Sequence, residues 1–158
     1  MNIIKNKKEL SSTRQRKIAL ELIETGIRRV LPSTIMNSSV SFEDNNRFLK
    51  IDEDNFDISK GRIFVVGGGK ASGLMAQTLE KILGAKNITD GVVNCKDSGY
   101  VTKKIRIIKA GHPLPNLQGI KGVREMLSMR QKYFITENDI VISLISGGGS
   151  SLLPYPAE

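Results

Sequence analysis

Two apolar segments that each lead into three glycines constrain this chain most. Residues 62–66 form a short, β-branched and nearly continuous apolar run, which is followed by Gly67, Gly68 and Gly69. Residues 139–145 form a second such run, which is followed after one residue by Gly147, Gly148 and Gly149. Runs of this kind are typical of strands buried on both faces, as in parallel sheets. Ligands bind beyond the carboxyl ends of such strands, so both glycine loops are predicted to lie where a site forms.

Helical and strand patterns alternate along the rest of this half of the chain. Apolar spacing, together with Gly and Pro positions, predicts helices over 74–84 and 117–132 and strands over 91–94 and 105–109. This order predicts an α/β fold, a Rossmann-like three-layer α/β/α arrangement with a mostly parallel sheet. We expect the fold to be incomplete, because the chain stops after a loop and a single apolar turn.

The first 60 residues have a different pattern. Ser11 or Ser12 is expected to cap a helix that runs to about Val30. The polar, acidic stretch that follows contains one strand candidate, Arg47–Ile51. We interpret residues 1–60 as a helix and connecting region of the same domain as the glycine-loop core, residues 61–158.

Composition argues against several functional classes. The formal net charge is +8, but residues 1–17 hold six basic side chains and one acidic one, and aromatic residues make up only 5% of the chain, so nucleic-acid binding is not expected. The single cysteine, Cys95, excludes an internal disulfide framework. Without a secretory signal or an apolar run of ~18 residues, we expect a cytoplasmic protein that does not bind membranes. Homo-oligomer formation stays open.

The first glycine loop combines glycines with a lysine and a serine, Lys70 and Ser72. Glycines let the backbone approach an anion, and a following helix directs N–H groups and its positive dipole end at it. A lysine in the first helical turn opposes that dipole, so Lys70 suggests an anionic partner; the alternative is a tight turn with a solvent-exposed lysine. Phe64 and Ala71 break the Walker A pattern, and Ser72 replaces the third glycine of the dinucleotide fingerprint.

The second glycine loop is flanked by hydroxyl groups, those of Ser146, Ser150 and Ser151. Hydroxyl and backbone N–H donors together suit phosphate or carboxylate oxygens. The alternative is a flexible surface loop. No G-x-S-x-G nucleophile elbow is present, which argues against a serine hydrolase.

A third loop, residues 110–116, carries the only histidine of the chain, His112, between a strand and a helix that Asn116 is predicted to cap. Two prolines hold this loop extended. His112 is a candidate general base, and the alternative is that it orders the loop by hydrogen bonding.

Three motifs in order, VVGGGKASGLMAQTLE (65–80), AGHPLPN (110–116) and SLISGGGSSLLPYPAE (143–158), resemble the glycerate 2-kinases of the MOFRL family. The resemblance implies ATP-dependent phosphorylation of D-glycerate to 2-phosphoglycerate with Mg²⁺. It also implies a two-domain enzyme, of which this chain covers most of the first domain and lacks the second.

The resemblance gives the loops roles in phosphoryl transfer, which depends on positioning and positive charge. Lys70 would stabilise the transferred phosphoryl group or hold the glycerate carboxylate, the glycine loops would donate N–H groups, and His112 would act as base or positioner. No acidic residue in these loops suits Mg²⁺, so its ligands are expected outside this chain. Two alternatives stay open, an NAD(P)H-dependent hydroxypyruvate reductase and a non-catalytic anion-binding module.

Overall fold

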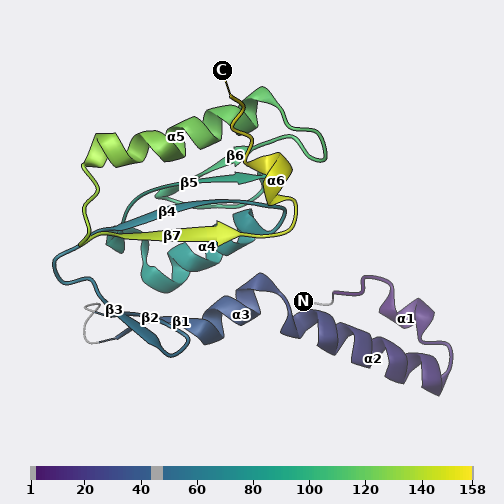
Figure 1. The fold of residues 1–158 in the computed structure, drawn as a ribbon. Helices are drawn as coiled ribbons and strands as arrows, with labels where there is room; N and C mark the ends of the chain where they lie inside the picture. The colour runs from purple at the N-terminus through teal and green to yellow at the C-terminus, as the bar shows by residue number, and fades with distance from the viewer. Residues whose placement is uncertain (1–2, 44–47, 158) are drawn as a thin grey trace.

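The structure is a computed structural model that describes residues 3–43 and 48–157. Its central sheet contains four parallel strands in the order β6-β5-β4-β7, with bounds β4 (Ile63–Gly68), β5 (Ile88–Cys95), β6 (Ile105–Lys109) and β7 (Ile140–Ile145). Helix α4 (Ser72–Leu83) covers one face and helix α5 (Leu117–Tyr133) covers the other (Figure 1). The predicted three-layer α/β/α fold is confirmed, and every strand pair in this sheet is parallel.

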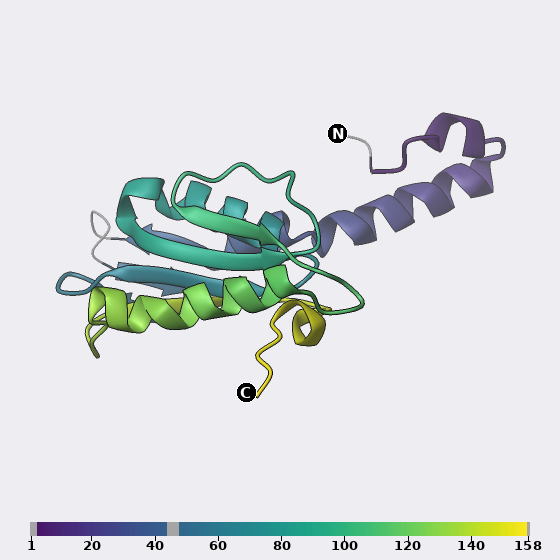
Figure 2. The same ribbon diagram turned by 90° about the horizontal axis from the view of Figure 1, so that it is seen from above.

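The core lies on both faces of the central strands β4 and β5. Successive side chains of a strand point to opposite faces, so Phe64 packs under α5 with Val92 and Met129, whereas Val65 packs against α4. Figure 2 shows the sheet between the two helices from above. Both predicted helices are present, and each has a residue that clearly marks one of its ends. Gly84, with a φ of 78°, ends α4, and the Asn116 side chain caps α5 as predicted.

The region before the core contains more structure than expected. Helices α1 (Lys7–Leu10) and α2 (Arg14–Arg29) are followed by α3 (Pro32–Ser39) and a small antiparallel sheet, β1 (Val40–Glu43), β2 (Phe48–Ile51) and β3 (Asp54–Asp57). The sequence predicts one strand here, Arg47–Ile51; β2 confirms most of it, and Arg47 lies outside the described residues. The flanking strands were missed because they are four residues long and largely polar.

The N-terminal helix starts later than predicted. Thr13, in an extended conformation, caps α2 by accepting a hydrogen bond from the Arg16 N–H at 3.3 Å. Ser11 instead lies at the C-terminal end of α1, where its hydroxyl donates to the Lys7 carbonyl at 2.6 Å. The predicted caps, Ser11 and Ser12, are therefore wrong, because the short helix α1 occupies the preceding turn.

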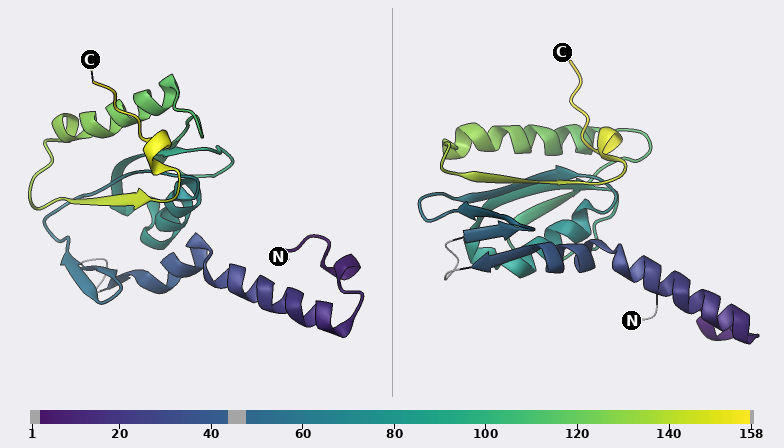
Figure 3. Two further views of the ribbon diagram at one scale, coloured as in Figure 1. Left: turned by 45° about the vertical axis from the view of Figure 1, so that its right-hand side comes forward. Right: turned by 60° about the horizontal axis from the view of Figure 1, so that its bottom comes forward.

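Helix α2 extends away from the sheet, with α1 folded back along it (Figure 3). Its apolar residues keep large exposed fractions, including 70% for Leu22 and 53% for Ile23. Within α2, all of which the structure describes, the only buried residue is Glu24. Two short elements complete the chain, the 3₁₀ helix η1 (Ala85–Asn87) and α6 (Gly149–Leu152). In the described ranges, no helix has both the length and the apolar character that crossing a membrane requires.

Candidate active site

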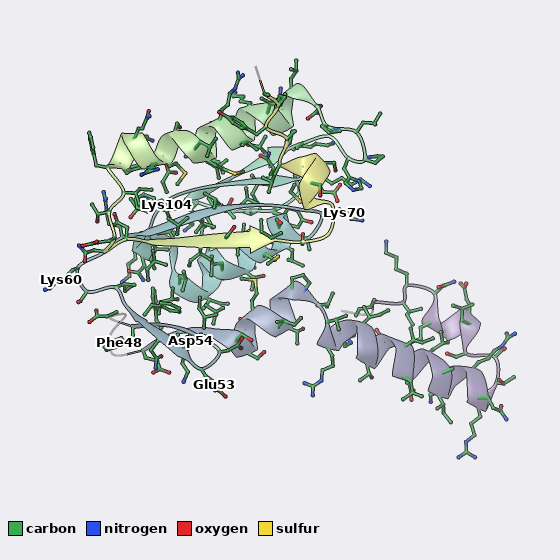
Figure 4. The ribbon with its side chains drawn as sticks, in the orientation of Figure 1. Phe48, Glu53, Asp54, Lys60, Lys70 and Lys104 are labelled. Carbon is green, nitrogen blue, oxygen red and sulfur yellow. The ribbon has the colours of Figure 1, made fainter. Side chains whose placement is uncertain are left out.

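Three loops meet at the carboxyl edge of the parallel sheet. They follow β4 (residues 69–71), β7 (residues 146–148) and β6 (residues 110–116). Lys70 lies at this edge in Figure 4, whereas Lys60 and Lys104 lie toward the opposite edge, where the strands begin. The parallel order of the strands is what brings these distant segments of the sequence together.

The first glycine loop is packed tightly against the end of β7. A Cβ atom at Gly67 would collide with the carbonyl oxygen of Leu144, and one at Gly69 would collide with the Ser146 hydroxyl. Gly69 also has a φ of +150°, which side-chain-bearing residues rarely adopt. Gly67 and Gly68 are the last two residues of β4 and pair with strands on both sides. Close packing against the end of β7 and the loop after it therefore explains Gly67 and Gly69.

The backbone donors of the first glycine loop are already used inside the protein. The N–H groups of residues 69–71 donate in turn to Asn94 O at 3.2 Å, Gly147 O at 2.9 Å and Ser146 Oγ at 3.0 Å. The buried Ser72 hydroxyl donates to Leu144 O at 2.9 Å. What this loop offers to a ligand is the Lys70 side chain, because the N–H groups expected to bind an anion have partners here.

Lys70 also lies differently from the prediction. Helix α4 begins at Ser72 with Ala71 as its N-cap, so Lys70 precedes the helix and is not in its first turn. Its side chain is exposed and its stem runs beside the second glycine loop, where a Cβ at Gly147 would be 3.9 Å from Lys70 Cε.

The second glycine loop keeps donors that have no protein partner. Ser146 accepts from Ala71, and Ser151 Oγ donates to Gly148 O at 3.2 Å. Among the hydrogen bonds of residues 3–43 and 48–157, none uses the N–H of Gly147, Gly148 or Ser150. Gly148 has a φ of 88°, in the left-handed region. Successive N–H groups in such a turn form an anion-binding concavity.

Lys70 and His112 meet at Gly148. A Cβ atom there would lie 2.8 Å from His112 Cδ2, 2.9 Å from His112 Nε2 and 3.5 Å from Lys70 Cγ. A residue with a side chain would have to displace the imidazole, so glycine is what lets the ring approach this loop. The two side chains that the sequence singles out thus both lie beside the same turn.

The loop that carries His112 is held by its own cap. Asn116 Oδ1 accepts from Gly111 N at 2.9 Å and from Gly119 N at 3.0 Å, which joins both ends of the loop. The His112–Pro113 peptide bond is cis. His112 is half-buried, so its ring remains accessible from the site.

Two residues near the site were not predicted to contribute to it. Asn94, near the end of β5, is fully buried and forms hydrogen bonds with the first glycine loop, with α5 and with α6. The Tyr100 ring lies over Gly73, and burial, followed by the neighbouring Cys95, raises the pKa of its phenol above the ordinary value. Cys95 itself is the last residue of β5 and is buried. The one available signal for Asn94 was a polar residue directly after two apolar ones, Val92 and Val93, near the end of the strand.

The described residues contain no cluster of metal-binding side chains. Nowhere in residues 3–43 and 48–157 do three or more His, Cys, Asp or Glu side chains come together in a way that could hold a metal. No step of the chemistry is therefore assigned to a metal held by these residues.

The fold and the site define a class, an α/β domain with glycine loops, a lysine and a histidine at the carboxyl edge of a parallel sheet. Residues 18–158 match the family described as "Domain of unknown function (DUF4147)", and the chain belongs to this family. The predicted resemblance to glycerate 2-kinases is confirmed by its relatives.

One relative, a "Glycerate 2-kinase" from Pyrococcus horikoshii, is 38% identical over 144 residues, which are 90% of this chain and 31% of the relative. A crystal structure of a protein from Pyrococcus horikoshii OT3 superposes with a TM-score of 0.78 at 36% identity, covering 93% of this chain and 32% of that one. A "Putative hydroxypyruvate reductase" from Agrobacterium vitis is 40% identical over 98 residues, 61% of this chain and 25% of the relative. The chain thus spans about a third or less of the length of these proteins.

Proposed function

We propose that this chain is the part of a glycerate kinase that carries the glycine loops, and that the enzyme transfers the γ-phosphoryl group of ATP to the 2-hydroxyl of D-glycerate, giving 2-phosphoglycerate. The supporting observation is the meeting of Lys70, His112 and the unpartnered N–H groups of the second glycine loop at Gly148. The name of the Pyrococcus relative supports glycerate as the substrate.

Lys70 and the second glycine loop would bind anionic oxygens. Phosphoryl transfer gains most from donors and charges placed around the phosphate oxygens before the reaction. The exposed Lys70 ammonium supplies a positive charge, and the N–H groups of Gly147 and Gly148 supply uncharged donors on the same turn. Both the carboxylate of glycerate and the phosphates of ATP have the oxygens that these groups bind, and either fits the same surface.

His112 would accept the proton that the reaction releases. The glycerate hydroxyl oxygen forms a bond to the γ-phosphorus of ATP, the bond from that phosphorus to the bridging oxygen breaks, and ADP leaves. The hydroxyl proton passes to a ring nitrogen of His112, whose ring lies beside Gly148, as the Lys70 stem does. When bound, Mg²⁺ would neutralise phosphate charge. The described residues contain no group of three or more His, Cys, Asp or Glu side chains that could hold it.

Replacing Lys70 by Met in the intact protein tests its role. We expect kcat/KM for glycerate phosphorylation to fall about 100-fold or more, since one charged donor at the site is lost. Lys60→Met is the matched control, because Lys60 is also exposed but lies toward the opposite edge of the sheet, and it should leave kcat/KM unchanged (Figure 4). Near-normal turnover of Lys70→Met would contradict the proposal.

His112→Asn tests proton transfer separately. We expect kcat to fall about 100-fold, within the range for a lost general base, while KM for glycerate changes little. A variant that changes only KM would show that His112 positions the substrate.

The name of the Agrobacterium relative keeps hydroxypyruvate reduction as a second candidate. A dinucleotide fingerprint would need glycine where Ser72 stands, and its side chain is buried and bonded to the end of β7. An assay for hydroxypyruvate-dependent NAD(P)H oxidation, run beside the kinase assay, separates the two activities. Thermal shifts with phosphate but with neither glycerate nor ATP would favour an anion-binding module. A cytoplasmic location and the domain division at residue 60 stay predictions.

A further inference from the structure

We propose that Asn94 is a positioning residue that fixes the loops of the candidate active site relative to one another. Asn94 is the second-last residue of β5 and has no exposed surface, so it acts through its neighbours and not on the substrate. The kinetic consequence rests on the proposed function, whereas the structural consequence does not.

The side-chain amide joins the two helices, α5 and α6, that directly follow two of the loops. Asn94 Nδ2 donates to Gly119 O at 2.9 Å and to Leu152 O at 2.7 Å, which uses both of its hydrogens. Gly119 lies in the first turn of α5, directly after the loop of His112. Leu152 is the last residue of α6, directly after the second glycine loop.

The main chain of the same residue joins the third loop. Asn94 O accepts from Gly69 N at 3.2 Å, and the next N–H, that of Lys70, donates to Gly147 O. One residue of β5 is therefore bonded to the loop that carries Lys70 and to the helices that directly follow the loops of His112 and Gly148. Lys70, His112 and Gly148 are the three groups that meet at the site.

The position is not explained by packing alone. The two preceding residues of β5, Val92 and Val93, are fully buried and apolar, as is usual in a strand covered on both faces. Asn94 Oδ1 is the one buried side-chain polar atom in the described part of the chain that has no hydrogen-bond partner. A Cβ at Gly122 of α5 would collide with this oxygen, so the helix makes room for the carboxamide. A buried amide that leaves one atom unpaired reduces stability. The two hydrogen bonds that the amide nitrogen donates are the compensating interactions.

The first experiment compares Asn94→Leu with Val92→Ala in the intact protein. Leucine has the same branching and number of side-chain heavy atoms as asparagine but lacks the donors, whereas Val92 is buried on the same face of the same strand and packs with Phe64 and Met129. Both variants should be less stable. At a temperature well below either Tm, Asn94→Leu should lose about 10- to 100-fold in kcat/KM, because loops displaced by about 1 Å misplace the reacting groups. Val92→Ala should stay within about twofold of wild type. Equal activity of the two variants would overturn the proposal.

The second experiment does not depend on activity. Amide hydrogen exchange of Asn94→Leu should speed up in both segments 111–120 and 146–153, and Val92→Ala should not change them together. Unchanged exchange in either segment would overturn the proposal even if activity falls. If wild type fails to phosphorylate glycerate, the proposed function is lost, and the exchange comparison still decides whether Asn94 holds the loops.

Gly122→Ala provides a variant that keeps Asn94 itself. Alanine favours the helix, so the added methyl disturbs the site only through the carboxamide it displaces. We expect the same joint increase in exchange, with reduced kcat/KM. If Asn94→Leu does not fold, Gly122→Ala decides the question. Exchange at the wild-type rate in both segments of Gly122→Ala would then overturn the proposal.

Discussion

The α/β core and helix α2 both have regularly spaced apolar residues, but these side chains are buried in the core and exposed in α2. In the core, Phe64 of β4 is fully buried and packs 5.2 Å, centroid to centroid, from the Tyr133 ring. In α2, apolar residues at helical spacing remain exposed, and the buried side chain is Glu24. The periodicity of a sequence therefore shows which face of an element is apolar, but only the tertiary structure shows what, if anything, covers that face.

The largest expected difference is between two large-to-small substitutions. Phe64→Ala should lower the free energy of unfolding by about 3–5 kcal/mol, because it leaves a cavity under α5. Leu22→Ala should change it by no more than about 0.5 kcal/mol, because Leu22 is 70% exposed. Denaturant titration measures both. A large loss for Leu22→Ala would mean that α2 is covered in solution.

Two buried glutamates give the next contrast. The Glu80 carboxylate accepts backbone N–H groups from residues 103–105 and so holds the loop before β6. Glu80→Ala leaves these donors without partners and should cost about 2–3 kcal/mol by denaturant titration. Glu24→Ala should leave global unfolding nearly unchanged, because Glu24 joins only α2 to residues 3–7 and to Arg28. Equal losses would show that α2 unfolds together with the core.

Two glycines should respond with opposite signs. Gly84 ends α4 with a φ of 78°, so Gly84→Ala should destabilise the core by about 1 kcal/mol. Gly26 lies inside α2 with nothing within 4 Å of its added Cβ, so Gly26→Ala should increase the stability of that helix by about 1 kcal/mol. Thermal unfolding followed by circular dichroism measures the first, and amide exchange within α2 measures the second. A destabilising Gly26→Ala would indicate that something packs against this face.

Acid should release α1 with little effect elsewhere. Hydrogen bonding to Lys7 is the main cause that lowers the pKa of Glu24 from 4.5 to about 2. A lowered folded-state pKa stabilises the folded form above pH 4.5, and this contribution disappears as the pH falls from 4.5 toward 2. The Arg62 guanidinium lowers the pKa of Asp139 in the core still further. Amide exchange at residues 7–10 should therefore accelerate over this pH range before the core strands open, and simultaneous opening would contradict this order.

The sequence predicted the core well because its signals are local. The strand over 105–109, the Asn116 cap and the stop at Gly84 each depend on a few neighbouring residues, and all three are confirmed. The small antiparallel sheet escaped prediction because β3, Asp54–Asp57, is entirely exposed and has a single apolar residue.

Within the candidate site, residue types were predictable and hydrogen-bond partners were not. Lys70, His112 and both triple glycines stand out in the sequence. Which N–H groups remain free depends on long-range hydrogen bonds. One example is the bond that the Ala71 N–H donates to the Ser146 hydroxyl, 75 positions away in the chain. The role of Asn94 could not be predicted for the same reason, because the partners of its side chain come from α5 and α6.

The two edge strands of the parallel sheet, β6 and β7, differ in the charge of their exposed side chains. β6 exposes Arg106 and Lys109 and follows two further lysines, whereas β7 exposes Val141, Ser143 and Ile145 and carries no charge. Charged side chains on an edge strand discourage another strand from pairing with it. Charged side chains therefore oppose strand addition at β6 but not at β7, so we expect a charged substitution at an exposed position of β7 to reduce aggregation of this chain.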